Sequence, residues 1–154
     1  MTRFKNVKRI HEVGVYDPEN PTTEPTEWLK LAKYIATVSD ESDEETEDEA
    51  FYDGDGTPEE VVYSVSAGYA FEGHYDSEIP AQKLIADMKY EVGDKRRLWF
   101  RVTTADGRYT FTEVASVTGI KAGDGDASEF EGFEATIKWI RKPKKVEVKN
   151  RPVV

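Results

Sequence analysis

Residues 61–71 read VVYSVSAGYAF, and this stretch decides the fold class. An apolar side chain occupies every odd position from Val61 to Phe71, with small residues at most of the positions between them. A period of two over this length predicts one half-buried β-strand, because successive side chains of a strand point to opposite faces. The odd positions are expected in the core, and the small residues on the other face are Ser64, Ser66, Gly68 and Ala70.

Further strands are predicted on both sides of this stretch. Segment 98–103 alternates in the same way, and Ala105-Asp106-Gly107 then predicts a hairpin turn. In segment 133–139 the alternation slips at Gly132 relative to Phe130, which predicts a β-bulge. The other expected strands are 7–16, 31–38 and 109–117.

One segment has the pattern of a helix. Pro80 suits a first helical residue, and apolar residues then recur at three- and four-residue spacing, so a helix is predicted over about 80–90. Its buried stripe is expected to be Ala81, Leu84, Ile85 and Met88, and its exposed residues Lys83, Asp87 and Lys89. Many strands with one helix predict a mainly β fold, a β-sandwich or barrel-like domain with one flanking α-helix.

The composition fits a single domain spanning 1–154. The chain is 38% hydrophobic and 12% aromatic, which is enough to build one core, and it has no cysteine. Its net charge of −10 argues against a surface that grips nucleic acid, since such binding needs clustered cations. No run approaches the roughly 18 apolar residues of a membrane helix, so no membrane partner is expected.

The charge is concentrated in two segments of opposite sign. Eight acids and no base lie in 40–49, which predicts a long acidic hairpin loop, whereas the C-terminal arm 141–154 is basic. A Pro- and Thr-rich stretch, 17–26, predicts an extended loop near the N-terminus. The two charged segments are open to two interpretations: a solvated loop with a frayed terminus, or surfaces through which copies of the chain meet head to tail.

Motifs for catalysis or metal binding are incomplete. His11 and His74 are the only histidines, and His11-Glu12 lacks the second histidine of a zinc-protease motif. Segments 53–58 and 124–129 begin like calcium loops but lack the glycine and glutamate that an EF-hand needs, so they are interpreted as Asp-Gly turns. We therefore expect no catalytic residue, no cofactor and no metal site, and a chain that is not an enzyme.

Three segments together resemble the major tail proteins of bacteriophages with long, non-contractile tails. They are ETEDEAFYDGDGTPE at 45–59, GYAFEGHYD at 68–76 followed by PAQKLI at 80–85, and GDGDASEFEGFE at 123–134. They occur in the family's order and cover most of the chain between about residues 30 and 140. The resemblance implies a tail tube fold, hexameric rings that stack into a hollow tube, and passage of the phage genome through the lumen without specific binding.

The resemblance also implies a place and partners for the chain. It would be a structural protein of the virion, assembled in the host cytoplasm, and its partners would be further copies and the tape measure, terminator and distal tail proteins. The alternatives are another ring-forming tail part (a tail terminator or a head–tail connector), a monomeric β-sandwich binding module and, more distantly, an acidic hydrolase.

An acidic lumen would repel the phosphates of DNA, so acids are the candidate lining of the tube. Self-repulsion is also expected to keep part of 40–56 mobile in the free subunit. The candidate lumen or interface acids are Glu44, Glu45, Glu47, Asp48, Glu49, Glu72, Glu129, Glu131 and Glu134. The candidate inter-ring basic arm is Arg141, Lys142, Lys144 and Lys145.

Overall fold

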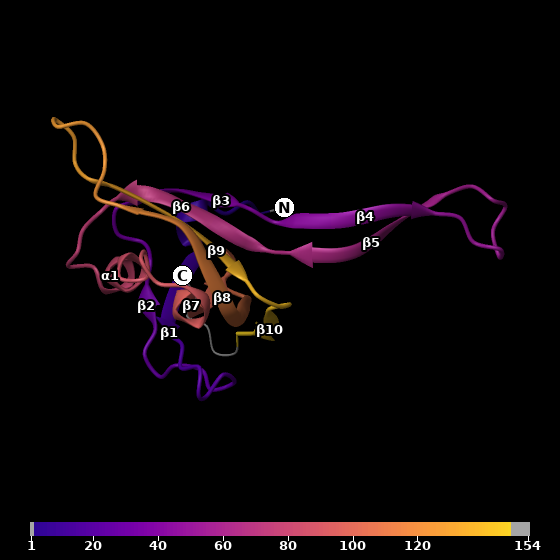
Figure 1. The fold of residues 1–154 in the computed structure, drawn as a ribbon, viewed down its shortest axis with the longest axis horizontal. Coiled ribbons are helices and arrows are strands. Elements are labelled where there is room, and N and C mark those ends of the chain that lie inside the picture. The colour runs from indigo at the N-terminus through magenta and orange to yellow at the C-terminus, as the bar shows by residue number, and fades with distance from the viewer. Residues whose placement is uncertain (1, 149–154) are drawn as a thin grey trace.

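The computed structural model describes residues 2–148, and within them the chain forms one curled antiparallel sheet and one projecting ribbon (Figure 1). The sheet has eight strands, seven of them in the order β2-β1-β7-β8-β9-β6-β3, with β10 paired to β8. Its strands are β1 (Ile10–Val15), β2 (Leu29–Lys30), β3 (Ile35–Asp40), β6 (Gly68–His74), β7 (Arg97–Thr103), β8 (Tyr109–Ala122), β9 (Gly132–Trp139) and β10 (Lys144–Glu147). The ribbon consists of β4 (Asp43–Glu49) and β5 (Glu59–Ser66), and the helical elements are α1 (Pro80–Ala86), η1 (Asn6–Lys8) and η2 (Gly93–Arg96). The mainly β prediction with one flanking α-helix is confirmed.

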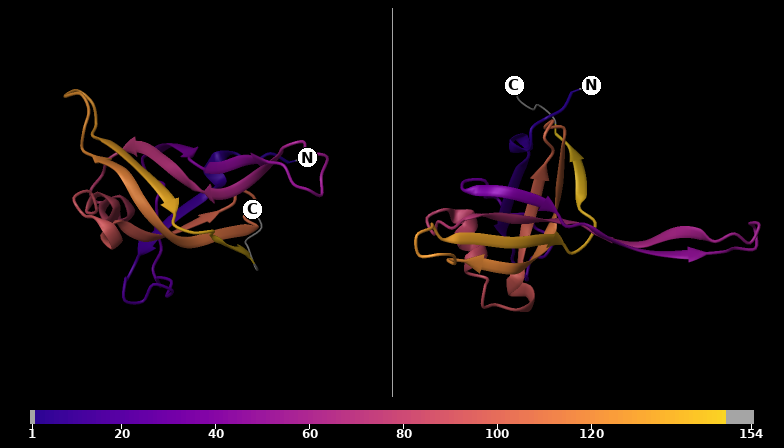
Figure 2. Two further views of the ribbon diagram at one scale, coloured as in Figure 1. Left: turned by 45° about the vertical axis from the view of Figure 1, so that its right-hand side comes forward. Right: turned by 90° about the horizontal axis from the view of Figure 1, so that it is seen from above.

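The sheet curls into a half-barrel because β8 changes partners along its length. The first half of β8 pairs with β7 and β10, and its second half pairs with β9. The register of β8 against β9 shifts between Thr118 and Lys121, and Gly119 lies there with a φ of 63°, which glycine tolerates. As a result β6 and β9 run across β1 and β7 (Figure 2). The prediction of a bulge at Gly132 is therefore wrong. The irregularity lies in β8, and Gly132 begins β9 in regular pairing with His74.

Aromatic side chains fill the space between the two crossing halves of the sheet. The Phe71 ring on β6 meets Phe100 on β7 with ring centroids 6.0 Å apart, and Phe100 meets Trp139 on β9 at 5.1 Å. All three side chains are buried, and the indole Nε1–H of Trp139 donates to the carbonyl oxygen of Phe100 at 3.0 Å. Edge-to-face and tilted ring pairs of this kind hold the halves together.

The predicted helix starts at Pro80 but ends four residues early. After Ala86 the chain continues in turns, and the Arg96 guanidinium donates to the carbonyl oxygens of Lys89 (2.6 Å) and Glu91 (2.8 Å), fixing this exit. Of the predicted stripe, Ala81, Ile85 and Met88 are buried. Leu84 is only half-buried, which corrects its assignment to the core, and Lys89, which lies beyond the end of α1, is half-buried as well.

The buried polar residue of the helix was not predicted. Gln82 is fully buried, its Oε1 accepts from the backbone N–H of Asp76 (2.8 Å), and its Nε2 donates to the carbonyl oxygen of His74 (3.0 Å). A buried amide is stable when its donors and acceptor are satisfied, so Gln82 ties α1 to the end of β6.

The strand predicted over 61–71 is two strands with different surroundings. The chain leaves β5 at Ser66 and begins β6 at Gly68, and a bulge at Tyr63 breaks the alternation between the pairs Glu45–Ser64 and Thr46–Val62. Phe71 is buried as predicted, but Tyr63 and Val65 are 52% and 62% exposed. The expectation that all odd positions lie in the core is therefore wrong for β5, because no second layer covers the ribbon.

The charged segments also differ from their predicted forms. Six of the eight acids of 40–49 lie in strand β4 and not in a loop, and the tip of the hairpin is formed by residues 50–58. Of the predicted strand 31–38, only residues 35–38 belong to a strand, β3, because residues 31–34 form the connection from β2, which contains Tyr34 with a φ of 64°. In the basic arm, Lys144–Glu147 form β10 beside β8, and residues 149–154 lie outside the described residues. The predicted loop 17–26 lies within a strand-free connection between β1 and β2.

Candidate functional site

The ribbon of β4 and β5 is the most prominent surface feature of the chain. It extends from the body on the side opposite the connection between β8 and β9 (Figures 1 and 2). Apart from half-buried Glu49 and Val61, every side chain of the two strands is exposed, and no described strand other than its own partner pairs with either of them. The ribbon has no core of its own.

One face of the ribbon carries most of its carboxylates. Direct cross-strand partners share a face, so Asp43, Glu45 and Glu47 lie on the side of Ser66, Ser64 and Val61. The Ser64 hydroxyl donates to Oε2 of Glu45 at 3.2 Å, in agreement with this register. At the outer end of the ribbon, a side-chain hydrogen bond with Glu49 raises the pKa of the Tyr63 phenol.

The other face combines apolar side chains with like charges. Val62 and Val65 lie on this face and are about half or more exposed. Asp48 is directly opposite Glu60, an unfavourable pairing of two carboxylates. On the first face, Glu49 and Glu59 form a second such pair. Exposed valines and directly opposed carboxylates are both typical of a surface that binds another molecule.

Two further predicted acids meet on the outer face of the body. Glu72 on β6 and Glu134 on β9 are direct cross-strand partners, and the Lys121 ammonium lies 3.7 Å from the Glu134 carboxylate. All three side chains are exposed. The neighbouring side chains on this face are small and uncharged: Ser39 lies opposite Ala70, and Ala70 lies opposite Thr136.

The remaining predicted acids lie at the far end of the body. Glu129 and Glu131 belong to the connection between β8 and β9, where they are exposed. Backbone hydrogen bonds close this loop: Gly123 N–H donates to the Gly132 carbonyl at 2.9 Å, and Gly132 N–H donates to that of Asp124 at 2.8 Å. The nine predicted acids therefore occupy three separate regions: the ribbon, the outer face of β6 and β9, and this loop.

The basic residues of the predicted arm lie beside the start of β8. Arg141 donates to Oε1 of Glu113 at 3.1 Å, and the Lys145 ammonium lies 4.2 Å from the centroid of the Tyr109 ring. Lys142 and Lys144 are exposed. A hollow of about 390 Å³ adjoins this region and is lined in part by Arg141, Lys144 and the buried Trp99. Arg141 and Lys145 are thus held against the body by their side chains, and the backbone of Lys144–Glu147 pairs with β8.

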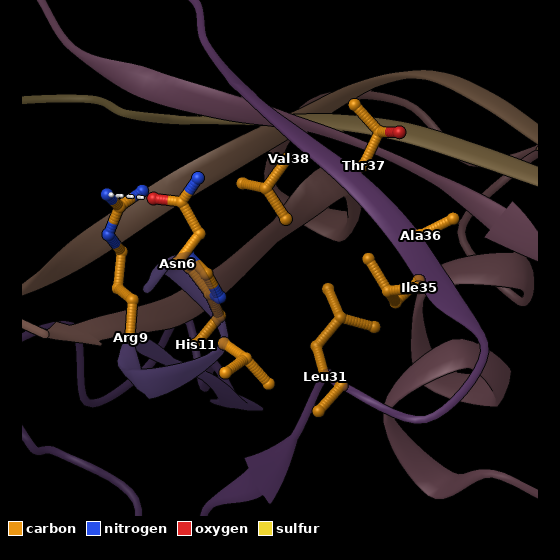
Figure 3. A pocket seen from close by; sticks show the side chains of 10 residues that line it. Asn6, Arg9, His11, Leu31, Ile35, Ala36, Thr37 and Val38 are labelled. Carbon is orange, nitrogen blue, oxygen red and sulfur yellow. Dashed lines mark hydrogen bonds between the residues drawn. The ribbon is translucent and has the colours of Figure 1, made fainter. Parts of the chain in front are cut away.

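A second hollow, of about 350 Å³, was not predicted from the sequence (Figure 3). It lies where the curled sheet stays open between its edge strands β2 and β3, beside η1. Leu31, Ile35 and Val38 form one side of it, and His11 with the hydrogen-bonded pair Arg9–Asn6 forms the other. The only feature of the sequence that pointed to this hollow is the basic N-terminal segment, which has no acid before Glu12.

The imidazole of His11, which lines this hollow, is buried. It is only 7% exposed and lies edge-on to the rings of Phe71 (5.2 Å) and Tyr69 (5.7 Å). Burial, and secondarily the nearby Arg9 charge, lowers its pKa from 6.5 to about 4, so the ring is neutral at pH 7. Its Nε2 has no hydrogen-bond partner among the described residues.

The described residues offer no centre for metal chemistry. No group of three or more His, Asp or Glu side chains within residues 2–148 is arranged to hold a metal ion. The two Asp-Gly segments form turns, and in the first of them Thr57 N–H donates to Oδ1 of Asp55 at 2.9 Å. In the same range, no helix is long and apolar enough to cross a membrane.

Comparison with solved structures identifies the fold. No protein-family model matches the sequence, and no curated protein matches it. A chain of the tail of an empty gene transfer agent particle, determined with C6 symmetry, superposes with a TM-score of 0.70 at 11% identity, covering 94% of this chain and 99% of that one.

Two chains from other assemblies share the fold. One belongs to the sheath–tube complex of an extracellular contractile injection system (TM-score 0.54, 15% identity, 95% of this chain and 93% of that one). The other belongs to the cap that terminates the tube of the anti-feeding prophage (TM-score 0.55, 11% identity, 96% and 93%). Since one of these systems is contractile, the fold does not distinguish contractile from non-contractile tails. The chain has the fold of subunits found in phage-like tail and tube assemblies.

Proposed function

We propose that this chain is a tail tube subunit, whose copies form hexameric rings that stack into a hollow tube through which DNA passes. The similarity to a chain of a C6-symmetric tail over nearly the full length of both supports this assignment. The segments that resemble major tail proteins support it independently, because they lie on the ribbon, on β6 and α1, and on the β8–β9 connection.

The observation that carries the proposal is the uncovered ribbon. A two-stranded ribbon is at best marginally stable in water, and this one leaves Val62, Tyr63 and Val65 exposed while it opposes carboxylates across its strands. A ring of identical copies covers such a surface on every subunit, because a heterologous interface repeats around the ring. The unpaired strand edges of each ribbon can then pair with the neighbouring subunit.

The acids supply the property that the lumen needs. A negative bore repels DNA phosphates, whereas a basic bore would retain the duplex by releasing its counterions. We assign to the lumen the candidate acids that lie on exposed strand faces. They are the acids on the Glu45 and Glu47 face of β4, together with Glu72 and Glu134. Glu129 and Glu131, at the opposite end of the body, are assigned to contacts between subunits.

The role is structural and not enzymatic. The subunit would belong to the virion after assembly in the host cytoplasm, and beyond its own copies it would contact the tape measure, terminator and distal tail proteins. The cations Arg141, Lys142, Lys144 and Lys145 would contact the acidic surface of the next ring.

Electron microscopy of the purified chain tests the assembly. The expected result is six-fold rings and hollow tubes whose length grows with protein concentration. A chain that stays monomeric at every concentration and ionic strength would contradict the proposal and would favour a monomeric binding module.

Charge reversal tests the lumen. Tubes carrying Glu45→Lys and Glu47→Lys are expected to bind double-stranded DNA with an affinity that falls steeply with salt, whereas wild-type tubes do not bind it. The matched control reverses two exposed acids of the β1–β2 connection, Glu19→Lys and Glu27→Lys, and should leave DNA binding unchanged. Equal DNA binding by the two variants would remove these acids from the lumen.

A second candidate function is that of a tube-terminating ring, favoured by the similarity to a chain of the tube-terminating cap. A terminator forms a ring that does not add further copies of itself. Rings that never elongate would therefore support this second function over a tube subunit.

A further inference from the structure

We infer that the tip of the ribbon inserts into the open seam of a second copy, with Tyr52 entering the hollow between β3 and η1; this rests on the proposed assembly of copies. The seam hollow is defined here as the space lined by Asn6, Arg9, His11, Leu31, Ile35 and Val38 (Figure 3).

The tip presents two aromatic side chains to solvent. Tyr52 is fully exposed and Phe51 is about half exposed. Both belong to the hairpin tip, residues 50–58, which lies at the end of the ribbon away from the body (Figure 1). β4 alone has seven residues, so at about 3.3 Å per residue it carries the tip about 23 Å outward. The tip therefore cannot turn back into the hollow of its own chain, and its partner must be another copy.

The seam hollow has the size and chemistry to accept one aromatic side chain. Its volume of about 350 Å³ lies at the small end of the range for binding pockets, about 300–1,000 Å³. Leu31 is buried, and Ile35 and Val38 are half-buried, so this side of the hollow is apolar. An aromatic ring placed against these side chains would bury apolar surface on both partners, and rings are common anchors of interfaces.

The opposite side of the hollow is polar and suits a phenol. Arg9 and Asn6 lie on this side, and the Arg9 guanidinium donates to Oδ1 of Asn6 at 3.3 Å. The Arg9 guanidinium can donate a further hydrogen bond to a hydroxyl, and the Asn6 amide can donate one or accept one. The hydroxyl of an inserted tyrosine would thus reach the polar side while its ring contacts the apolar side.

The charges around the two partners have opposite signs. The described N-terminal segment next to the hollow carries Arg3, Lys5, Lys8 and Arg9 and no acid before Glu12. Around Tyr52, the tip and the adjoining strand end carry Asp48, Glu49, Asp53 and Asp55, with no base from 41 to 82. Complementary potentials of this kind set the orientation and speed the encounter of two copies.

The absence of cysteine from the sequence allows a direct cross-linking test. A chain carrying both Tyr52→Cys and Ala36→Cys places one thiol at the tip and one at the exposed rim of the hollow. If the tip enters the seam of the next copy, mild oxidation links chains head to tail, and a non-reducing gel shows a ladder of multimers. The matched control pairs Tyr52→Cys with Tyr90→Cys, at an equally exposed residue away from the hollow, and should give dimers at most.

Substitutions at the tip measure the contribution of the ring. Tyr52→Ala is expected to raise the concentration needed for assembly about tenfold or more, as for an anchor residue, and Tyr52→Phe less than about threefold. The control Tyr90→Ala should leave it unchanged.

The outcomes separate the two proposals. Tubes that form equally well with Tyr52→Ala and give no ladder from the 36–52 pair would overturn the seam contact while leaving the tube function standing. A wild-type chain that never assembles would overturn both.

Discussion

The body and the ribbon of this protein are built from the same kind of strand, yet they differ in what covers them. In the body, Phe71 and Phe100 belong to facing halves of one curled sheet and are almost completely buried. In the ribbon, Tyr63 and Val65 continue the alternating sequence pattern and yet remain more than half exposed. Alternation thus specifies a strand in both regions, whereas burial depends on whether a second layer is present.

This difference separates the part of the chain that stabilises the fold from the part that is available for assembly. In the body, the fully buried amide of Gln82 is satisfied internally by the backbone of His74 and Asp76. The ribbon places Asp48 opposite Glu60 and leaves both without a counter-charge on its strands. Such an arrangement costs stability in the free chain, and in the proposed assembly cations of another subunit would offset that cost.

The largest expected effect tests the contrast in burial. Phe100→Ala should lower the free energy of unfolding by about 3–5 kcal/mol, because it removes a fully buried ring that contacts Phe71 and Trp139. Val65→Ala in the ribbon should change it by no more than about 0.5 kcal/mol. Urea denaturation of the monomer measures both values. Similar losses at the two sites would show that the ribbon is as well packed as the body.

The next effect concerns the buried imidazole of the body. Because the pKa of His11 is about 4 in the fold and 6.5 in the unfolded chain, protons bind preferentially to the unfolded chain as the pH falls. The free energy of unfolding therefore keeps its full value above pH 6.5. It falls by up to about 3 kcal/mol as the pH decreases from 6.5 to about 4. The variant His11→Phe should show a shallower loss of stability over this window than wild type. Identical slopes for His11→Phe and wild type would contradict the assignment.

A smaller effect is expected for the ion pair that joins β1 and β7. Arg101 donates to both carboxylate oxygens of Glu12, at 3.0 and 3.1 Å, and lies 4.2 Å from the centroid of the Trp28 ring. Arg101→Lys keeps the charge but loses the two-pronged geometry, and should cost about 1 kcal/mol. A double-mutant cycle with Glu12→Gln isolates the pair, and a coupling energy near zero would show that it contributes nothing to stability.

The smallest effect belongs to the like charges of the ribbon. Glu60→Lys places a cation opposite Asp48 and should stabilise the ribbon by about 0.5 kcal/mol. Hydrogen exchange of the β4 and β5 amides in the monomer should slow accordingly, while exchange in β7 is unchanged. The wild-type ribbon should exchange rapidly in the free subunit and become protected in tubes. Equal protection in the two states would show that assembly does not cover it.

Local patterns predicted most of the elements. The strands at 98–103 and 133–139 and the turn at Gly107 were predicted within one or two residues, since alternation and turn residues act between near neighbours. Pro80 marked the start of α1 for the same reason. The candidate acids were identifiable as a concentration of charge, but their division among three regions was not, because it depends on which strands pair.

By itself, the sequence determined where the chain is extended, where it turns and how its charge is divided between an acidic and a basic segment. Only the tertiary structure decided that β8 bends at Gly119, that β6 packs under β1 and β7 while β5 does not, and that a hollow stays open beside His11. The reason is physical: an alternating strand gains its stability from the layer that faces it, and that layer comes from residues distant in sequence. A strand without such a layer, like β5, has the same local pattern and a surface that only another molecule can cover.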